Sequence, residues 1–343
     1  MHIPENYLSP ATCAVMTAVM VPVWVHAVKK VNTEIPKKDV PMIGVGAAFS
    51  FLGMMFNVPL PGGTTGHAVG GTLIALLLGP NAACLAVTVA LLIQALLFGD
   101  GGILSFGANC FNMAFVLPYF GYFIYRLIAG KSEKKSRQLL GAAVGSYAGI
   151  NLAAFCAAIE FGIQPYLFHD AAGKALYCPY TLNVSIPAMM IGHLTLFGIA
   201  EIVYTVAVYS YVKTIAVNKV SGNAGKMVSE NGIVDNSQNI KKKPIFILMA
   251  VLIALVPIGL LAQGTAWGEW GSDEIMKITG LSYVPAKLGT GWSLSSVFPD
   301  YTMAGIPDAI AYIMSAIVGV AIMIIVFKVA SSLIKGKTDY QVK

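Results

Sequence analysis

Charged residues are scarce in this sequence. Only 11% of the 343 residues are charged, whereas 57% are hydrophobic. A soluble domain carries about 25% charged residues, so this chain lacks the polar surface that a soluble globule of its size needs. Several apolar runs reach about 20 residues, the length of a helix that crosses a bilayer. The composition therefore predicts an all-α, multi-pass membrane protein surrounded by lipid.

Sequence patterns of common catalytic and thiolate sites are also missing. No H-E-x-x-H zinc-protease motif and no G-x-x-x-x-G-K-[ST] phosphate loop occur, so ATP-driven transport would need a partner ATPase. The cysteines form no C-x-x-C pair, and most of them lie in apolar runs as small packing residues. We therefore expect a protein that is not an enzyme and has no resident cofactor. The five cysteines are Cys13, Cys84, Cys110, Cys156 and Cys178.

The basic residues are spread over short runs between the apolar segments. A nucleic-acid-binding protein would cluster them on one face, so the net charge of +6 predicts no nucleic-acid partner. A secretory signal peptide begins with a positive region, but the first basic residue, apart from histidine, is Lys29. His2 is a large second residue, which disfavours removal of Met1. We therefore expect Met1 to keep a free α-amine.

Seven apolar runs precede a polar stretch, and two runs follow it. Lys and Arg cluster after the first, fifth and seventh runs, so the positive-inside rule puts the N-terminus outside the cell membrane and the C-terminus in the cytoplasm. The predicted domains are a seven-helix core (1–217), a cytoplasmic linker (218–243) and two appended helices with an external Trp-bearing loop (244–343). The runs span residues 12–28, 40–56, 68–78, 82–98, 108–128, 139–163, 184–211, 244–261 and 306–329.

The first two residues can chelate a metal ion. The α-amine of Met1, the amide nitrogen of His2 and its imidazole Nδ1 close a five-membered and a six-membered ring. The amide must lose its proton, which ions late in the divalent affinity order drive best, and a planar nitrogen set suits Ni(II) or Cu(II). An ordinary surface histidine is the alternative for His2. Three nitrogens leave one position for a fourth ligand.

His67 is the candidate for this fourth ligand. It follows Gly62-Gly63-Thr64-Thr65-Gly66, whose glycines allow close backbone approach, and it is predicted to begin a short helix on the outer side. Taken alone, His67 is equally well interpreted as a polar residue at the membrane interface. Its location on the same side as Met1 and His2 favours a metal site. His26 and His169 are predicted to lie at the cytoplasmic end and in a solvated loop.

Three segments together resemble the CbiM/NikM family, over residues 1 to about 215. They are Met1-His2-Ile3-Pro4-Glu5-Asn6-Tyr7-Leu8-Ser9-Pro10, Pro61-Gly62-Gly63-Thr64-Thr65-Gly66-His67 and Leu78-Gly79-Pro80. Members are the substrate-binding subunits of energy-coupling-factor transporters for cobalt and nickel. The resemblance implies a transported Ni(II) or Co(II) held by the amine, amide and imidazole of Met1 and His2 and by His67. The Gly-Gly-Thr-Thr-Gly-His form is closer to nickel members. The departure is Glu5-Asn6-Tyr7, where many members have Asp/Glu-Gly-Phe/Tyr.

The resemblance also implies partners, namely a transmembrane coupling subunit and two ABC ATPases. Ala11, Ala14 and Ala18 form a pattern like the one by which the first helix of this family docks the coupling subunit, with packing inside this chain as the alternative. The two appended helices are similar to the small subunit, or fused C-terminal domain, of this family. Phe298-Pro299-Asp300-Tyr301 lies where such domains carry a Pro-Asp motif.

Two other functions are compatible with the sequence. Glu160, Glu201 and His193 lie in or near apolar runs, where ionisable residues are often functional, so a proton-coupled secondary metal carrier is one alternative. No second inverted half is visible, which favours interhelical hydrogen bonding for these residues instead. The other alternative is a membrane metal sensor that does not transport. The sequence favours nickel import but leaves nickel and cobalt both open.

Overall fold

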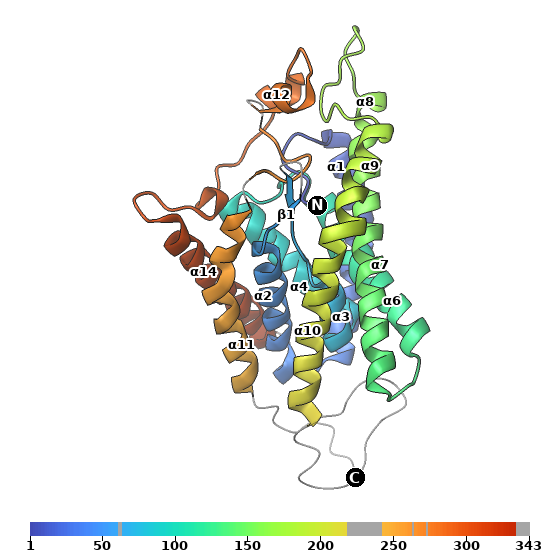
Figure 1. Ribbon diagram of the computed structural model, residues 1–343, viewed down its shortest axis with the longest axis vertical. Helices are drawn as coiled ribbons and strands as arrows, with labels where there is room; N and C mark the ends of the chain where they lie inside the picture. Colours follow the sequence, from blue (N-terminus) through green and yellow to red (C-terminus); the bar gives the residue numbers. More distant parts are fainter. Residues whose placement is uncertain (61–63, 218–241, 263, 272–273, 334–343) are drawn as a thin grey trace.

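The computed structural model describes residues 1–60, 64–217, 242–262, 264–271 and 274–333 of the protein. Its long helices run side by side along the long axis of the molecule (Figure 1). Strands are confined, in these ranges, to one short antiparallel hairpin of β1 (Val58–Leu60) and β2 (Thr64–Gly66). This architecture confirms the predicted all-α class.

The nine predicted apolar runs all lie on helical segments. In chain order these segments are α1 (Pro10–Glu34), α2 (Pro41–Met55), α3 (Gly71–Leu78), α4 with η2 (Pro80–Ile93, Gln94–Phe98), α5 with η3 and α6 (Phe106–Asn109, Cys110–Val116, Leu117–Ala129), α7 (Lys135–Gly162), α9 with η4 and α10 (Leu182–Gly192, His193–Phe197, Gly198–Val217), α11 with η6 (Lys242–Leu255, Val256–Leu261) and α14 (Asp308–Leu333).

Seven of these segments, within the described ranges, are long and apolar enough to cross a membrane. The two short ones are α2, with 15 residues, and α3, with 8 residues. At 1.5 Å per residue, α2 is about 22 Å long and α3 about 12 Å. A hydrocarbon core of about 30 Å therefore makes α3 a half-spanning helix.

The remaining elements are short and lie mostly at the end of the bundle that carries the N-terminal loop. Figure 1 shows α8 and α12 at this end, and the α6–α7 loop and the chain ends that flank residues 218–241 at the opposite end. The predicted topology requires the basic loops to lie at the end of the bundle opposite to the N-terminal loop. Most of the predicted linker, residues 218–241, lies outside the described residues. The short helices are η1 (Lys37–Asp39), α8 (Gln164–Leu167), α12 (Ile275–Thr279), α13 (Ala286–Thr290) and η7 (Pro299–Tyr301).

The appended helices pack directly on the core. Figure 1 shows α11 and α14 beside α2. A Cβ atom on Gly44 of α2 would lie 2.9 Å from the carbonyl oxygen of Met323 in α14, so the two backbones touch here. Tyr312 of α14 also donates a hydrogen bond to the carbonyl oxygen of Met55 at 2.9 Å. The appended domain therefore forms part of the wall around the core.

Glycines bring α6 and α7 equally close. A Cβ atom on Gly145 would lie 2.5 Å from the carbonyl oxygen of Gly121, and one on Gly149 would lie 2.6 Å from that of Leu117. Small residues at helix interfaces allow such close approach in membranes, where van der Waals packing drives helix association. The interface between α6 and α7 therefore depends on glycine at these positions.

We expect Gly145→Ala to destabilise the protein by about 1–3 kcal/mol, because the added methyl group meets backbone rather than a movable side chain. Thermal unfolding in detergent measures the effect. Val144→Leu, on the exposed side of the same helix, is the matched control and should leave the melting temperature unchanged. Equal melting temperatures for both variants would show that this interface accommodates the added methyl group.

Candidate metal centre

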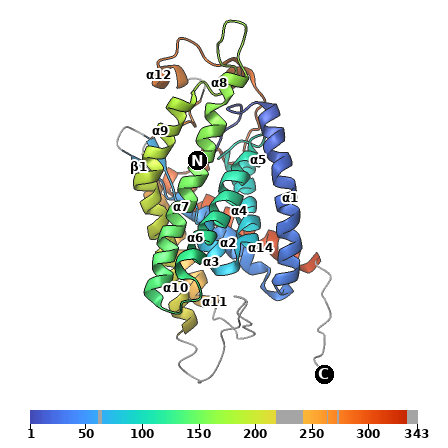
Figure 2. The same ribbon diagram turned by 90° about the vertical axis from the view of Figure 1, so that its right-hand side faces the viewer.

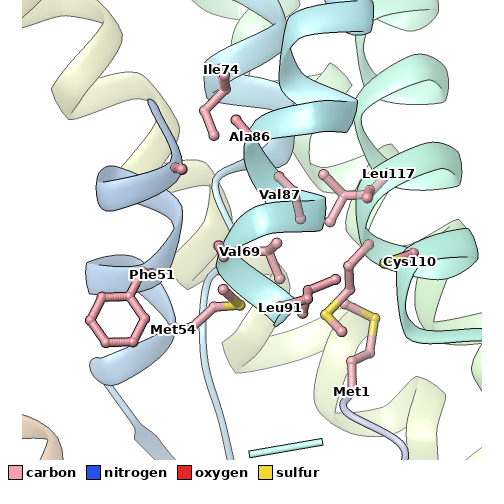
Figure 3. Packing of buried hydrophobic residues seen from close by; sticks show 14 of the residues in the cluster. Met1, Phe51, Met54, Val69, Ile74, Ala86, Val87, Leu91, Cys110 and Leu117 are labelled. Atoms are coloured by element: carbon pink, nitrogen blue, oxygen red, sulfur yellow. The ribbon is translucent and has the colours of Figure 1, made fainter. Parts of the chain in front are cut away.

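The N-terminus of the chain is buried inside the helix bundle. Met1 is 6% exposed, His2 2% and Ile3 0%. Figure 3 shows the side chain of Met1 pointing into the buried hydrophobic cluster that contains Leu91. Chain termini are normally exposed and poorly ordered unless other contacts hold them. This terminus therefore needs dedicated hydrogen-bond partners.

Those partners come from the segment that follows η2. Asn109 accepts from the amide of Ile3 at 2.8 Å and donates back to the carbonyl oxygen of Ile3 at 3.1 Å. The amide of Gly102 donates to the same carbonyl oxygen at 2.9 Å. A Cβ atom on Gly102 would lie 2.7 Å from the backbone nitrogen of Glu5, so only glycine allows this approach. These hydrogen bonds fix the backbone of Ile3 and, with it, the position of the first residues.

The departure from the family pattern at Asn6 has a simple structural explanation. Asn6 has a φ of 64°, in the left-handed region where glycine is preferred. Asparagine is among the few other residues that adopt this conformation readily. Asn6 also donates a hydrogen bond to the carbonyl oxygen of Trp292 at 2.9 Å. The substitution of asparagine for glycine therefore keeps the turn of the N-terminal loop.

His67 lies in the short link between β2 and α3. The prediction that His67 begins a helix is wrong, because Gly70 has a φ of 70° and α3 begins only at Gly71. Glu201 of α10 holds the link by accepting hydrogen bonds from Val69 at 2.7 Å and from Gly70 at 3.0 Å. His67 itself is buried, at 8% exposed. The link carries its imidazole to the N-terminus.

The two imidazoles meet nitrogen to nitrogen. His67 Nε2 lies 3.3 Å from His2 Nδ1, and His67 Nδ1 lies 3.3 Å from the carbonyl oxygen of Ala68. A proton on His67 Nδ1 would satisfy that carbonyl and leave Nε2 with a lone pair. Two nitrogens bound to one metal at a right angle lie about 2.9 Å apart if each bond is about 2.0–2.1 Å. A small movement therefore lets both rings share an ion.

Two carboxylates border this pair, and the sequence did not single them out. Asp100 Oδ1 lies 3.1 Å from His2 Nδ1, and Glu269 Oε1 lies 3.6 Å from the α-amine of Met1. Asp100 lies between Gly99 and Gly101, and Glu269 belongs to the Trp-bearing loop of the appended domain. Their negative charges favour a cation at this place. Only the tertiary fold reveals that these distant positions meet.

Burial keeps both imidazoles neutral. Burial, followed by the charge of the α-amine, lowers the pKa of His2 to about 3. Burial also holds the pKa of His67 well below its usual value, with His2 and the α-amine as further causes. A metal ligand must offer an unprotonated nitrogen, so both rings are ready to bind at neutral pH.

The polar atoms present suit a nitrogen-rich site. His2 Nδ1, the ring nitrogen of the expected chelate, faces His67 Nε2 at 3.3 Å, whereas the other ring nitrogen of His2, Nε2, is buried without a hydrogen-bond partner. The described part of the chain contains no group of three or more His, Cys, Asp or Glu side chains that could hold a metal ion. The α-amine and the His2 amide can add backbone nitrogen ligands to the two imidazoles.

The other histidines differ in their surroundings. His26 and His169 are both exposed, which agrees with the solvated loop predicted for His169. His193 is buried, and it lines a narrow pocket with Met1, Met189 and Trp267. Its Nδ1 lies 2.8 Å from the carbonyl oxygen of Met189. The structure therefore brings Met1, His2 and His67 together and adds His193 as a neighbour whose place the sequence left open.

These features define a multi-pass membrane protein with a buried imidazole pair at its N-terminus. Residues 2–218 match the CbiM family, described as the cobalt uptake substrate-specific transmembrane region, and residues 241–336 match the PDGLE domain. The chain belongs to the CbiM family. The predicted resemblance to this family, with a fused C-terminal domain, is confirmed.

Relatives of similar length share the whole arrangement. The chain is 46% identical to a probable fused nickel transport protein LarMN of Lactiplantibacillus plantarum, over 96% of this chain and 97% of the relative. It is 41% identical to the fused nickel transport protein NikMN of Rhodobacter capsulatus, over 94% and 95%. These names agree with the prediction of a transporter subunit rather than an enzyme.

Two crystal structures, both described as transition metal transporters, resemble the core. A truncated one is 59% identical and covers 62% of this chain and 99% of its own, with a TM-score of 0.59. The other is 57% identical and covers 64% and 98%, with a TM-score of 0.60. The fold of the core is therefore shared with solved metal transporters.

We expect His2→Ala to lower nickel affinity more than His67→Ala, because it breaks a chelate ring while His67→Ala removes one separate nitrogen. Both losses should exceed the roughly 10–100-fold typical of residues that only orient a ligand. Metal titration of the purified variants measures the ranking. His26→Ala and His169→Ala are the controls and should bind as the parent does. The site is wrong if either control loses metal while His67→Ala keeps it.

Proposed function

We propose that this chain is the substrate-binding membrane subunit of an importer for divalent nickel or cobalt, of the energy-coupling-factor type. Met1, His2 and His67 are the proposed ligands, through the α-amine, the His2 amide nitrogen and two imidazoles. The observation that carries the proposal is the 3.3 Å separation of the two imidazole nitrogens in a buried site beside the chain terminus. The relatives named as nickel transport proteins support it.

Nickel is the favoured substrate in this proposal. Ligation by an amide nitrogen requires the loss of its proton, and a planar set of four nitrogens suits Ni(II). Loss of that proton leaves the complex with a single positive charge. The carboxylates of Asp100 and Glu269 lie beside the site and offset this charge. Cobalt is the ion in the family description and is the second substrate to test.

The buried carboxylates of the core support import without a proton relay. Glu160 accepts a hydrogen bond from Asn112 at 2.8 Å, and Glu201 accepts from the link that carries His67. Both carboxylates thus join separate segments, as the interhelical interpretation predicts. A proton-coupled carrier would need such groups to load and release protons during transport. Their structural hydrogen bonds favour the substrate-binding subunit.

The orientation that we propose puts the N-terminus outside the cell membrane and the C-terminus in the cytoplasm. The basic α6–α7 loop lies at the opposite end of the bundle from α8 and α12 (Figure 2). Cytoplasmic loops carry the excess of Lys and Arg, so this end is the inner one. The domains that we propose are 1–217, 218–243 and 244–343. The two family matches, which end at 218 and begin at 241, support these boundaries.

Transport in this proposal needs a transmembrane coupling subunit and two ABC ATPases. Ala11, Ala14 and Ala18 are exposed on α1, so packing within this chain does not account for them. Figure 2 shows α1 at the edge of the bundle. A face of small residues at such an edge lets another transmembrane helix approach closely. This face is where we propose that the coupling subunit docks.

One residue added before Met1 should abolish nickel binding. The added residue turns the α-amine into an amide and moves the free amine out of the chelate, while the buried terminus has no room for it. A tag at the C-terminus is the control and should leave affinity unchanged. Calorimetric titration of the two proteins gives the comparison. Equal affinity in both would rule out the α-amine as a ligand.

Vesicles that contain this chain with its coupling subunit and ATPases should take up nickel only when ATP is present. A proton gradient should change the rate little, because the proposed mechanism moves no protons in exchange for the ion. Uptake of radioactive nickel, with ATP and a proton gradient supplied separately, distinguishes the three functions. Uptake driven by the gradient alone would favour the carrier, and tight binding without uptake would favour the sensor.

A further inference from the structure

The Phe298-Pro299-Asp300-Tyr301 segment of the appended domain contains an unusual turn. Asp300 has a φ of 51° and Tyr301 a φ of 61°, so two successive residues that are not glycine adopt left-handed conformations. A bulky residue such as tyrosine rarely adopts this conformation. Residues in such conformations persist where their surroundings force them, and they cluster at functional sites. The surroundings of Tyr301 therefore need a closer look.

Contacts on every side hold Tyr301 in place. Its ring stacks on Phe98 with centroids 4.6 Å apart and meets Tyr312 edge-on at 5.4 Å. Its carbonyl oxygen accepts a hydrogen bond from Ser315 of α14 at 3.1 Å. The amide of Phe298 donates to the carbonyl oxygen of Leu97 at 2.7 Å, which ties the turn to the end of η2. Both the core and α14 thus fix the direction of the phenol group.

The phenol hydroxyl points at a carboxylate beside the proposed metal ligands. Tyr301 Oη donates a hydrogen bond to Asp100 Oδ2 at 2.6 Å. Gln94 Nε2 donates to the same oxygen at 2.9 Å and to Tyr301 Oη at 3.0 Å. Two donors therefore occupy one oxygen of Asp100. The other oxygen, Oδ1, faces His2 Nδ1 at 3.1 Å.

The turn around Asp100 leaves this carboxylate few internal restraints. Gly99 and Gly101, on either side, have φ values of 72° and 86°. A Cβ atom on Gly101 would lie 3.3 Å from His2 Cδ2, so the backbone passes close to the imidazole. Glycines permit this path but do not orient the side chain between them. The orientation of Asp100 therefore depends on Gln94 and Tyr301.

We propose that Tyr301 is a positioning residue for the metal site. It holds Asp100 so that one carboxylate oxygen lies beside His2 Nδ1, and it thereby fixes the position of the negative charge next to the ion. The inference rests on the proposed function, because it takes His2 as a ligand. It gives the appended domain a part in metal binding, through a hydroxyl group that contacts Asp100 and none of the proposed ligands.

A packing role for the tyrosine ring is the competing explanation, and removal of the hydroxyl alone separates the two. Tyr301→Phe keeps the stacking on Phe98 and loses the hydrogen bond to Asp100. Tyr312→Phe is the matched control, since it removes the hydroxyl of a neighbouring buried tyrosine that donates to Met55 of α2 and not to the site. Asp100→Asn tests the residue through which Tyr301 is proposed to act.

The experiment uses the full chain in detergent, with nickel affinity, the optical spectrum of the nickel complex and the melting temperature as readouts. Tyr301→Phe should lower nickel affinity about 10–100-fold, the range for groups just outside the ligand set, and should shift the nickel absorption band. Tyr312→Phe should leave both unchanged. Asp100→Asn should lower affinity at least as much. The Tyr301→Phe/Asp100→Asn double variant should be no weaker than Asp100→Asn, because both changes remove one coupled unit.

Unchanged affinity and spectrum in Tyr301→Phe would overturn the proposal. It would also be overturned if both tyrosine variants lost affinity equally along with melting temperature, since that pattern indicates packing. His67→Ala, measured alongside, keeps the proposed function separate. If His67→Ala loses nickel while Tyr301→Phe binds normally, the ligand set stands and the role of Tyr301 fails. If His67→Ala keeps nickel, the proposed function itself fails.

Discussion

The burial of the chain terminus inside a membrane-spanning bundle is the constraint on which the rest of the structure depends. An α-amine and two imidazoles lose their contacts with water there, and burial of polar groups is costly unless they find partners. Glu269 lies beside the α-amine and Asp100 beside the His2 imidazole, while Asn109 and Gly102 bond the backbone of Ile3. In our account the remaining cost is offset by a cation bound to the α-amine, the His2 amide and the two ring nitrogens that face each other, His2 Nδ1 and His67 Nε2.

Several segments contribute residues to the surroundings of the buried terminus. The link before α3 carries His67, and Glu201 of α10 holds it. The segment after η2 brings Asp100 and Asn109, while the appended domain adds Glu269 and Tyr301. Three π-helical segments, η2, η3 and η4, interrupt the long helices of the described core, and such segments often occur at functional sites. The proposed metal site thus has residues of both the core and the appended domain around it.

The positions of the helices, and the proximity of Met1, His2 and His67, could be predicted from the sequence. Apolar runs of membrane length and the spacing of basic loops have few interpretations, because a lipid bilayer restricts backbone structure strongly. The start of α3 was wrong, because the left-handed conformation of Gly70 is not visible in an apolar pattern. The contacts of Asp100, Glu269 and Tyr301 could not be predicted, since hydrogen bonds and ion pairs between residues far apart in the sequence leave no local signal. That Asn6 keeps the turn of the N-terminal loop was predictable only in part, because asparagine tolerates a positive φ.

The planar nitrogen site is the central claim, and the spectrum of the nickel-loaded protein tests it most directly. Four nitrogen ligands in a plane predict a yellow, diamagnetic complex, with X-ray absorption that shows nitrogen neighbours only. Asp100 and Glu269 are close enough to offer oxygen ligands to an ion placed differently. A pale, paramagnetic complex with six ligands that include carboxylate oxygens would contradict the account.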